Sequence, residues 1–277
     1  FFMSLKQEKI PITLLVITYN EADNIARCLD SVPFVEEKIV IDSGSTDDTV
    51  EIAKKHGARV IHQPWMGFGA QRNFASSQAS HDWIIFLDAD EALSEELSNE
   101  LQAKLPQVMN SDVSAGIMIL TYQFMGRPMK WYKQMARERK ARIYHRGRAH
   151  WSNVPVHESL QYSGRAEVFK AHFIHYFNPT LVHLDLKYLR YAELKSLAWN
   201  QKDRKSPVIF WPFVFFVTFL KDYLLRLAFL DGTRGFIAAW LAANYALYKR
   251  FRYFEIKSFP ESIKLAHNEL KKRDLAR

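Results

Sequence analysis

The chain has 277 residues, of which 48% are apolar and 14% aromatic, and this composition excludes an intrinsically disordered protein. It contains one cysteine, Cys28, which excludes an internal disulfide and argues against a thiolate metal site. The sequence from Lys6 to Lys9 is polar where a signal peptide requires an apolar run. We therefore expect no such peptide and a reducing compartment.

The net charge of +8 is unevenly distributed. Residues 181–277 carry 18 Lys and Arg against 9 Asp and Glu, and residues 126–150 hold nine basic residues and one acidic residue, Glu138. Nucleic acid, an anionic lipid surface or a phosphorylated ligand would each complement such basic segments. Charge alone therefore leaves the partner open.

The amino-terminal part alternates strand and helix patterns. Ile12 to Ile17 is an unbroken run of β-branched residues and leucine, typical of a parallel strand covered on both faces, and it ends at the polar sequence TYNE, residues 18–21. Apolar residues then recur at helical spacing from Ala22 to Leu29, and Asn20 is the expected helix cap.

A second strand and helix follow. Lys38 to Ile41 predicts a short strand that ends at Asp42. Ser45 and Asp48 have the three-residue spacing of a capping box, so we expect them to begin the next helix, which Gly57 ends.

The fourth predicted strand, Asp82 to Leu87, runs directly into Asp88-Ala89-Asp90. Because side chains alternate faces along a strand, the two aspartates are expected on one side of its end. Two like charges held that close favour a cation, and carboxylate oxygens suit Mg²⁺ or Mn²⁺. The alternative is an exposed acidic turn, because Glu91 and two further glutamates follow at once.

With a third strand at Arg59 to His62, these elements predict an open, mostly parallel α/β sheet, in which ligands bind beyond the carboxyl ends of the strands. The motifs GxGxxG and GxxxxGK[ST] are absent, so dinucleotide-oxidoreductase and P-loop functions lose their main support. A nucleotide would then be held by side chains. We expect Asp42 to accept from a base N–H, Tyr19 to stack and Asp88 to reach a ribose hydroxyl.

Four segments carry a resemblance to a known family: TYNE at 18–21, DSGSTDDT at 42–49, GAQRN at 69–73 and DAD at 88–90. Over residues 11–101, and more loosely to residue 179, the chain resembles the inverting family 2 glycosyltransferases of GT-A fold. It looks closest to the lipopolysaccharide core β-1,4-glucosyltransferases that act on inner-core heptose. The residues expected to bind a UDP-hexose donor are Thr18, Tyr19, Glu21, Asp42, Ser43, Arg72, Asp88 and Arg142.

Residues 113–125 predict a further strand, which leads into the basic segment. Among its cations, Arg137, Arg139, Lys140 or Arg142 would neutralise a diphosphate or a phosphorylated acceptor, since arginine offers paired donors. The alternative is a solvated basic face, because nine cations cannot all contact one ligand.

The resemblance implies that Glu158, in the segment VPVHE, is the general base. Such a group is required because a sugar hydroxyl is a weak nucleophile until its proton is removed; the alternative is a glutamate on an exposed turn. His157 would either have a structural role, holding Glu158 or a strand edge, or contact the substrate. In a predicted strand at 166–176, the resemblance implies that His175 completes the metal site with Asp90, whereas His172 is expected to be an ordinary core or surface histidine.

The carboxyl-terminal part changes character. Residues 181–198 predict an amphipathic helix, and two apolar stretches follow at 207–220 and 235–248, flanked by Lys and Arg. The first stretch has 14 residues, short of the roughly 20 that a spanning helix requires. Together with Trp211 and Trp240, the pattern favours monotopic association with a membrane surface. The alternative is a helical subdomain that packs on the sheet or forms a dimer. A charged terminal helix is expected from about residue 259.

These observations lead to one working hypothesis. Residues 1–180 form a GT-A domain and residues 181–277 a helical, membrane-associating region at the cytoplasmic face of the inner membrane. The enzyme would transfer glucose from UDP-glucose, with Mg²⁺ or Mn²⁺, to a lipid-linked saccharide such as core heptose, and would not bind nucleic acid. The rivals are transfer to a polyprenyl phosphate, a nucleotidyltransferase, and a non-catalytic membrane-binding protein.

Overall fold

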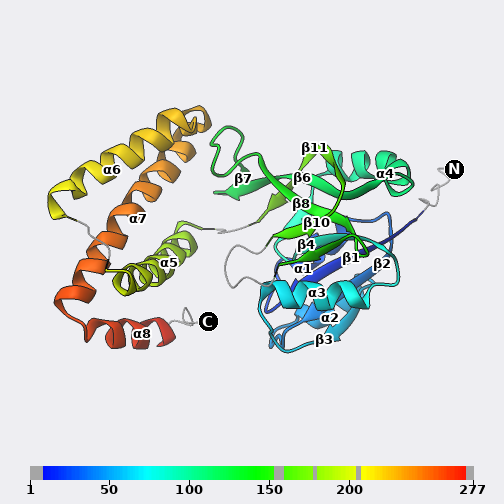
Figure 1. Cartoon of the computed structure of the whole chain (residues 1–277), viewed down its shortest axis with the longest axis horizontal. Helices are drawn as coiled ribbons and strands as arrows, with labels where there is room; N and C mark the ends of the chain where they lie inside the picture. Colours follow the sequence, from blue (N-terminus) through cyan, green and yellow to red (C-terminus); the bar gives the residue numbers. More distant parts are fainter. Residues whose placement is uncertain (1–8, 153–158, 177–179, 204–206, 273–277) are drawn as a thin grey trace. The chain divides into compact units, whose positions relative to one another are not determined.

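The computed structural model describes residues 9–152, 159–176, 180–203 and 207–272. The chain forms two compact units (Figure 1). The first contains Phe1–Tyr122 and Arg137–Phe177, and the second contains Gln123–Ala136 and Asn178–Arg277. Part of the basic segment between residues 126 and 150 therefore belongs with the carboxyl-terminal helices.

A mixed sheet in the order β3-β2-β1-β4-β8-β6-β11-β5 forms the first unit. Strands β1 to β4 are mutually parallel, as are β6 and β11, whereas β8 and β5 run antiparallel to their neighbours. The strands are β1 Ile10–Thr18, β2 Val35–Asp42, β3 Arg59–His62, β4 Trp83–Asp88, β5 Glu91–Leu93, β6 Val113–Phe124, β8 Glu138–His145 and β11 Arg165–His175, with the separate pair β9 Ala149–Trp151 and β10 Leu160–Tyr162. The predicted, mostly parallel α/β architecture is confirmed.

Strand β1 shows why its sequence forms a central strand. Its side chains alternate between two cores: Leu14 and Val16 enter one, and Leu15 and Ile17 enter the other. All four are at most 7% exposed. A strand that is buried on both faces must be apolar throughout, which is the pattern that the sequence shows.

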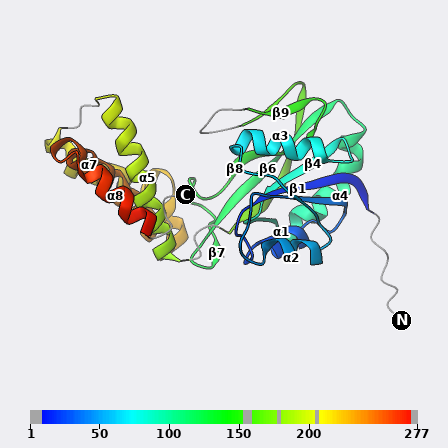
Figure 2. The ribbon, with the colours of Figure 1, turned by 90° about the horizontal axis from the view of Figure 1, so that it is seen from below.

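Helices cover both faces of this sheet (Figure 2). The helices are α1 Ile25–Asp30, α2 Thr49–Lys55, α3 Phe68–Gln78 and α4 Glu95–Met109. Apolar side chains of α1, α2 and α4 share one core, while α3 contributes Ala75 to the other, where Trp151 and Leu160 of the β9–β10 pair also lie. The carboxyl ends of β1, β2 and β4 lie at one edge of the sheet and carry the candidate site.

Two of the predicted helix caps are wrong. Helix α1 begins at Ile25, and Asn20 instead adopts a left-handed conformation with φ of 54°, in which its Oδ1 accepts the N–H of Thr46 at 2.8 Å. The Ser45 hydroxyl donates to Asp42 Oδ1 at 2.5 Å instead of capping α2. The Ser45 hydroxyl also accepts the Asn20 N–H at 2.9 Å, so contacts between the two strand-end loops, together with the local bond to Asp42, have replaced the helix caps.

The second unit is helical. It contains β7 Arg127–Pro128, α5 Leu181–Gln201, a 3₁₀ turn Val208–Phe210, α6 Trp211–Leu220, a π-helical turn Lys221–Leu225, a 3₁₀ turn Ala228–Asp231, α7 Gly232–Ser258 and α8 Ser262–Lys272. Asp231 binds the 123–136 segment, because its carboxylate accepts the N–H groups of Lys130, Trp131 and Tyr132 at 2.9, 3.0 and 2.7 Å. Arg252 joins α7 to Glu193 of α5, with Nη2 2.9 Å from Oε1.

The predicted apolar stretches both form helices here. Residues 207–220 form the 3₁₀ turn and α6, and residues 235–248 lie within α7. One segment of the described chain, Val208–Leu225, is long and apolar enough to cross a membrane by length and composition. Membrane association itself stays a prediction.

Gly116 of β6 is a sensitive position in the sheet. A methyl group there would lie 2.8 Å from Phe169 Cε2 and 2.9 Å from Ile143 Cβ, closer than packed carbon atoms allow. We expect Gly116→Ala to lower the free energy of unfolding by about 1–3 kcal/mol, measured by urea denaturation. Gly147→Ala is the control, since its added carbon would meet only the His145 side chain, at 3.2 Å. Equal stability of both variants would contradict this packing.

Glu37 of β2 gives the fold a pH dependence. Burial opposes its charge, but hydrogen bonds from Ser80 and Thr13 outweigh burial and lower the pKa of Glu37 to about 2. Because this folded-state pKa lies below the unfolded one, the carboxylate stabilises the fold fully above about pH 4.5 and loses its effect between about pH 4.5 and 2.

We expect Glu37→Gln to cost about 1–2 kcal/mol at neutral pH. The difference between the variant and the wild type should shrink as the pH falls through that window, as measured by urea unfolding at several pH values. Glu51→Gln is the control, because Glu51 lies on the exposed face of α2 in a 68% exposed pair with Lys55. A difference for Glu37→Gln that does not change with pH would exclude the charged hydrogen bonds as its cause.

Candidate active site

The polar ends of three parallel strands lie side by side. Thr18 of β1 is in register with Asp42 of β2, and Ile17 of β1 is in register with Asp88 of β4. The Ser43 N–H also donates to the Thr18 carbonyl at 3.0 Å, which continues the ladder one residue past β2. The sequence therefore brings Thr18, Asp42 and Asp88 to one edge of the sheet, as predicted from their positions at strand ends.

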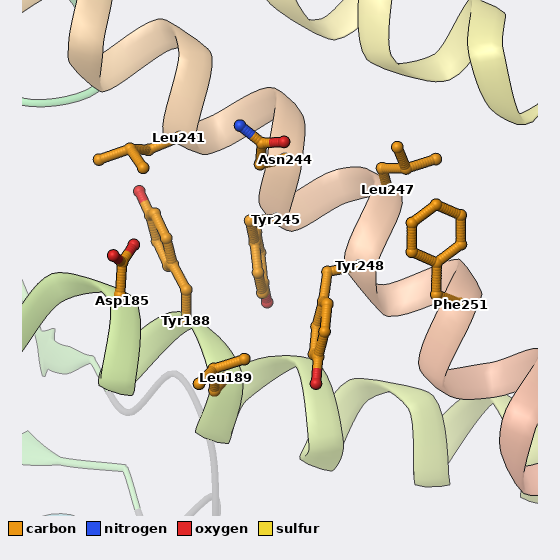
Figure 3. A pocket seen from close by; sticks show the side chains of 9 residues that line it. All are labelled: Asp185, Tyr188, Leu189, Leu241, Asn244, Tyr245, Leu247, Tyr248 and Phe251. Carbon is orange, nitrogen blue, oxygen red and sulfur yellow. The ribbon is translucent and has the colours of Figure 1, made fainter. Parts of the chain in front are cut away.

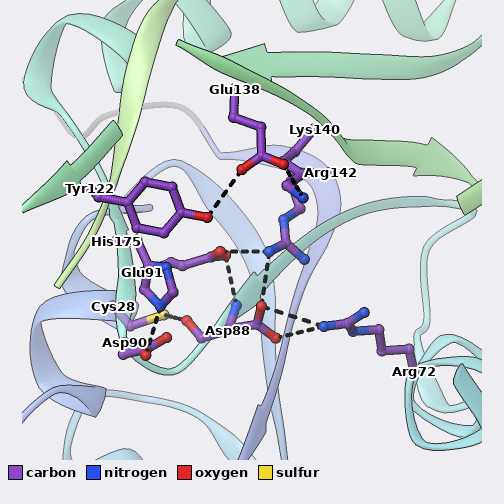
Figure 4. Close-up of polar contacts among 10 residues, drawn as sticks. All are labelled: Cys28, Arg72, Asp88, Asp90, Glu91, Tyr122, Glu138, Lys140, Arg142 and His175. Atoms are coloured by element: carbon purple, nitrogen blue, oxygen red, sulfur yellow. Dashed lines mark hydrogen bonds and ion pairs between the residues drawn. The ribbon is translucent and has the colours of Figure 1, made fainter. Parts of the chain in front are cut away.

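Two arginines from different elements bind Asp88 (Figure 4). Arg72 of α3 places Nη2 3.0 Å from Oδ1, and Arg142 of β8 places Nη2 2.8 Å from Oδ2. Both guanidinium groups are buried, with 6% and 7% of their side chains exposed. Burial opposes the charge of Asp88, but the two arginines outweigh burial and hold its pKa well below the usual range.

Arg142 reaches this position through an irregularity in the sheet. Adjacent residues Gly116 and Ile117 of β6 pair with Ile143 and Ala141 of β8, so Arg142 is an extra residue in its strand. Such a bulge changes the direction of a side chain. The alternative of a solvated basic face does not hold for Arg142, although its neighbours Arg137 and Arg139 are exposed. Binding of a diphosphate by Arg142 stays a prediction.

The sequence pattern did not reveal the role of Glu91, which was among the residues expected in an exposed acidic turn. Its side chain is 1% exposed; it accepts the Asp88 N–H at 3.0 Å and lies 2.5 Å from Arg142. Burial raises the pKa of Glu91, Arg142 lowers it and Asp88 raises it, with a net increase. Asp88, Arg142 and Glu91 thus form one closed network. The apolar pair Ala92 and Leu93 after Glu91 was the available sign of a buried strand.

Asp90 and His175 form a second pair. Asp90 Oδ2 lies 2.8 Å from His175 Nε2, and the Tyr176 N–H donates to the Asp90 carbonyl. Strand β11 brings His175 there, because it pairs with Glu91 of β5. Burial opposes the charged imidazole, but the hydrogen bond and charge of Asp90 raise the pKa of His175 above its usual range. Strand β4 ends at Asp88, so the alternation of side chains along a strand does not place Asp90 on the same side as Asp88. The two aspartates contact different partners.

This pair fits a hard divalent cation. Two adjacent ligands of an octahedral Mg²⁺, each about 2.1 Å from the ion, lie roughly 3 Å apart, close to the observed oxygen–nitrogen separation. Mg²⁺ usually takes few protein ligands and fills its other positions with water and phosphate oxygens. The described residues contain no group of three or more His, Cys, Asp or Glu side chains placed to hold a metal. Metal binding by Asp90 and His175 stays a prediction.

The other residues expected to bind the donor lie around the ends of β1 and β2. Thr18 is 5% exposed, and its Oγ1 has no hydrogen-bond partner within the described residues. Asp42 accepts the N–H groups of Gly44 and Ser45, at 2.9 and 3.0 Å, and therefore also shapes its own loop. Ser43 Oγ accepts from Gln71 Nε2 at 3.2 Å, a contact that the sequence patterns did not suggest.

Tyr19 and Glu21 complete that group. Tyr19 is 39% exposed, as a stacking residue requires. Glu21 accepts from Asn24 Nδ2 at 2.8 Å, and burial raises its pKa above the usual range. Their roles toward a donor stay predictions, as do those of Thr18, Asp42 and Ser43.

The remaining histidine and base predictions have different outcomes. Glu158 and His157 lie outside the described residues. His172 Nδ1 lies 2.7 Å from Thr121 Oγ1, and burial lowers the pKa of His172. It is thus engaged in the sheet and is separate from the Asp90–His175 pair.

Glu138 forms a further cluster that the sequence did not indicate. It accepts from Tyr122 OH at 3.0 Å and pairs with Lys140 at 2.7 Å (Figure 4). The Tyr122 ring lies 5.2 Å from that of His175. Lys140 is therefore ion-paired near the site.

Glu91→Ala tests the closed network. It leaves the Asp88 N–H without an acceptor and Arg142 with one carboxylate fewer, so we expect a loss of about 2–4 kcal/mol in the free energy of unfolding. Glu91→Gln keeps an acceptor and should cost much less. Glu95→Ala, at an exposed position four residues on, is the control in the same urea denaturation. If Glu91→Ala were as stable as Glu95→Ala, the network would not stabilise the fold.

Comparison with known proteins gives the family. Residues 13–170 match the model of Glycosyl transferase family 2. An uncharacterized glycosyltransferase of Rickettsia felis is 31% identical over 254 residues, which cover 84% of this chain and 85% of the relative. The lipopolysaccharide core biosynthesis glycosyltransferase LpsC of Rhizobium meliloti is 27% identical over 251 residues, covering 86% of this chain and 90% of LpsC.

Among solved structures, glucosyl-3-phosphoglycerate synthase from Mycobacterium tuberculosis, in complex with Mn²⁺, UDP and glucosyl-3-phosphoglycerate, has a TM-score of 0.34. It is 27% identical and covers 41% of this chain and 44% of its own. A TM-score of that size does not relate the two sites. The family match spans more than half of the chain and includes the three strand ends, the DAD segment and both arginines of the site. The chain is a member of glycosyl transferase family 2, with the GT-A-like arrangement of a mixed, mostly parallel sheet and flanking helices.

Proposed function

We propose that the enzyme transfers a hexose, with inversion, from a UDP-hexose to a hydroxyl of a lipid-linked saccharide such as lipopolysaccharide core heptose. The proposed donor is UDP-glucose. The observation that carries this proposal is the Asp90–His175 pair next to the doubly ion-paired Asp88, at the carboxyl ends of parallel strands. The name of LpsC supports the choice of a lipopolysaccharide core acceptor.

The donor would lie across the strand ends. Asp42 would accept from the base and Tyr19 would stack on it, while Asp88 would reach the ribose. Asp90 and His175 would hold Mg²⁺ or Mn²⁺, which, when bound, offsets negative charge on the diphosphate. Arg72 and Arg142 keep Asp88 ionised and fixed in place. Its carboxylate would therefore be oriented to accept a hydrogen bond from the ribose before the donor binds.

The acceptor requires a base. We propose that Glu158 removes the proton from the acceptor hydroxyl as the hydroxyl oxygen attacks the anomeric carbon from the face opposite UDP, which inverts the configuration. This role rests on the family resemblance of the VPVHE segment. A membrane surface is proposed as a further partner, at the cytoplasmic face of the inner membrane, because the carboxyl-terminal region is basic and the acceptor is lipid-linked.

UDP release tests the donor chemistry. Purified protein is incubated with Mn²⁺ or Mg²⁺ and, separately, UDP-glucose, UDP-galactose or UDP-N-acetylglucosamine. We expect slow hydrolysis of one donor, abolished by EDTA and reduced at least about 100-fold in Asp90→Ala, because the variant loses a metal ligand. Asp112→Ala is the control, since Asp112 is 67% exposed in a pair with Arg165.

Extracted, truncated lipopolysaccharide then tests the acceptor. Glycosylation that stops in Glu158→Gln, while donor binding persists, would support the proposed base. Transfer to a polyprenyl phosphate instead would identify the first rival, and release of pyrophosphate in place of UDP would identify a nucleotidyltransferase. Metal-independent binding of vesicles without affinity for any nucleotide sugar would leave a non-catalytic protein.

A further inference from the structure

Helix α6 is apolar on every side and yet exposed. The continuous segment Val208–Leu225 has 18 residues and a mean hydropathy of 1.7, and 6% of it is buried. Phe213, Phe216 and Val217 are 63, 60 and 63% exposed. A contiguous apolar surface of this kind is unfavourable in water and marks a site that another apolar phase or molecule covers.

The composition of α6 decides between the ways in which lipid can cover it. A helix that lies on a membrane surface has a charged or polar face. Within Trp211–Leu220, Thr218 is the one polar side chain, so α6 has no face to direct toward water. An apolar run of 10–14 residues indicates a core helix or a re-entrant or interfacial segment, and the exposure of α6 excludes a core helix in the described structure.

Although Val208–Leu225 as a whole has the length and composition of a membrane span, its uncharged part is shorter than a full crossing requires. The uncharged run from residue 207 to residue 220 rises roughly 20 Å as a helix, whereas the hydrocarbon core is about 30 Å thick. Lys221 and Asp222 follow immediately. Such a segment reaches into one leaflet without crossing both.

The second unit is built to support this insertion. Phe215 and Phe219 pack against Trp240 of α7, with ring centroids 4.8 and 6.1 Å apart, which fixes one side of α6 and leaves the other outward. Asp222, at the end of the apolar run, is 1% exposed; it accepts from Arg226 at 2.5 Å and from Tyr132 OH at 3.1 Å. Its charge is therefore neutralised inside the protein and does not face lipid.

The surrounding charge indicates which bilayer would be bound. Residues 181–277 carry twice as many basic as acidic side chains, and Lys221, at the end of α6, is exposed. A basic segment is attracted to a leaflet that contains anionic lipid. Apolar insertion and this attraction act together.

We propose that α6 inserts as a re-entrant helix among the acyl chains of one leaflet of an anionic bilayer, with Phe213, Phe216, Val217 and Leu220 facing lipid. This inference rests on, and makes specific, the proposed membrane partner of the enzyme. It places the helix below the headgroups, deeper than a surface-bound helix, and within one leaflet, unlike a spanning helix.

Depth-dependent quenching tests the position. The full chain carries a fluorophore on Val217→Cys or, as the control, on Leu265→Cys, which lies 59% exposed on α8. The natural Cys28 is 1% exposed, so the label attaches to the introduced thiol. In phosphatidylcholine–phosphatidylglycerol vesicles, we expect spin labels deep in the acyl chains to quench the Val217→Cys label and not the Leu265→Cys label.

Substitutions in α6 test whether its apolar side chains cause the binding to vesicles. The double variant Phe213→Glu/Phe216→Glu should lose vesicle co-sedimentation by at least tenfold, whereas Leu265→Glu should bind like the wild type. Quenching by headgroup spin labels alone, or binding that survives the double substitution and disappears at high salt, would overturn insertion. Oligomers that bury α6 without lipid, and fail to bind vesicles, would also overturn it.

UDP release is measured on the same preparations. A protein that releases UDP and does not insert would refute the insertion alone, and one that inserts but releases UDP from no donor would refute the proposed transfer. The double variant should keep donor hydrolysis, because neither phenylalanine belongs to the donor site.

Discussion

The ion pairing of Asp88 with two buried arginines is the interaction on which the site depends. Its side chain is 27% exposed, and a carboxylate that has lost most of its contact with water is stabilised by charged partners. Arg72 comes from α3, on one face of the sheet, and Arg142 from β8, within it. The carboxylate therefore fixes a helix and a strand in place as well as its own position. Removing either arginine would leave charge uncompensated at the end of β4.

The network also places the second half of the site. Glu91 holds Arg142 and the backbone of Asp88, and the strand that begins with Glu91 pairs with the strand that carries His175. Asp90 lies between Asp88 and Glu91, which the network holds in place. The ligands proposed for the cation are thus positioned by groups that do not need to touch it, as supporting contacts in metal sites commonly are.

Much of the fold followed from the sequence because the strands of the first unit have continuous apolar runs with polar ends. Thr18, Asp42 and Asp88 were predicted at one edge from that pattern alone. Glu91 was not, because the partner that permits its burial, Arg142, is 51 residues away. Asn20 was assigned to a helix cap for the same reason: its side chain accepts from Thr46, 26 residues away, and local spacing carries no record of that contact.

The charge distribution was also only partly informative. The excess of basic residues between 126 and 150 suggested a ligand surface, but its members have different environments. Arg142 lies buried in an ion-pair network, Lys140 pairs with Glu138, and the backbone of Lys130 is held by Asp231. A count of charges cannot separate a cation that fills an internal site from one in solvent, since both appear identical in composition.

The extra residue in β8 has a consequence for how related sequences can vary. Substitutions near Arg142 change one side chain at a time, whereas loss of a single residue between Ala141 and Ile143 would restore a regular ladder with β6. Because that residue is Arg142, the site would lose the guanidinium that pairs with both Asp88 and Glu91. This short stretch should therefore tolerate amino-acid exchange better than a change of length, and a sequence alignment that opens a gap there would describe a protein with a different active site.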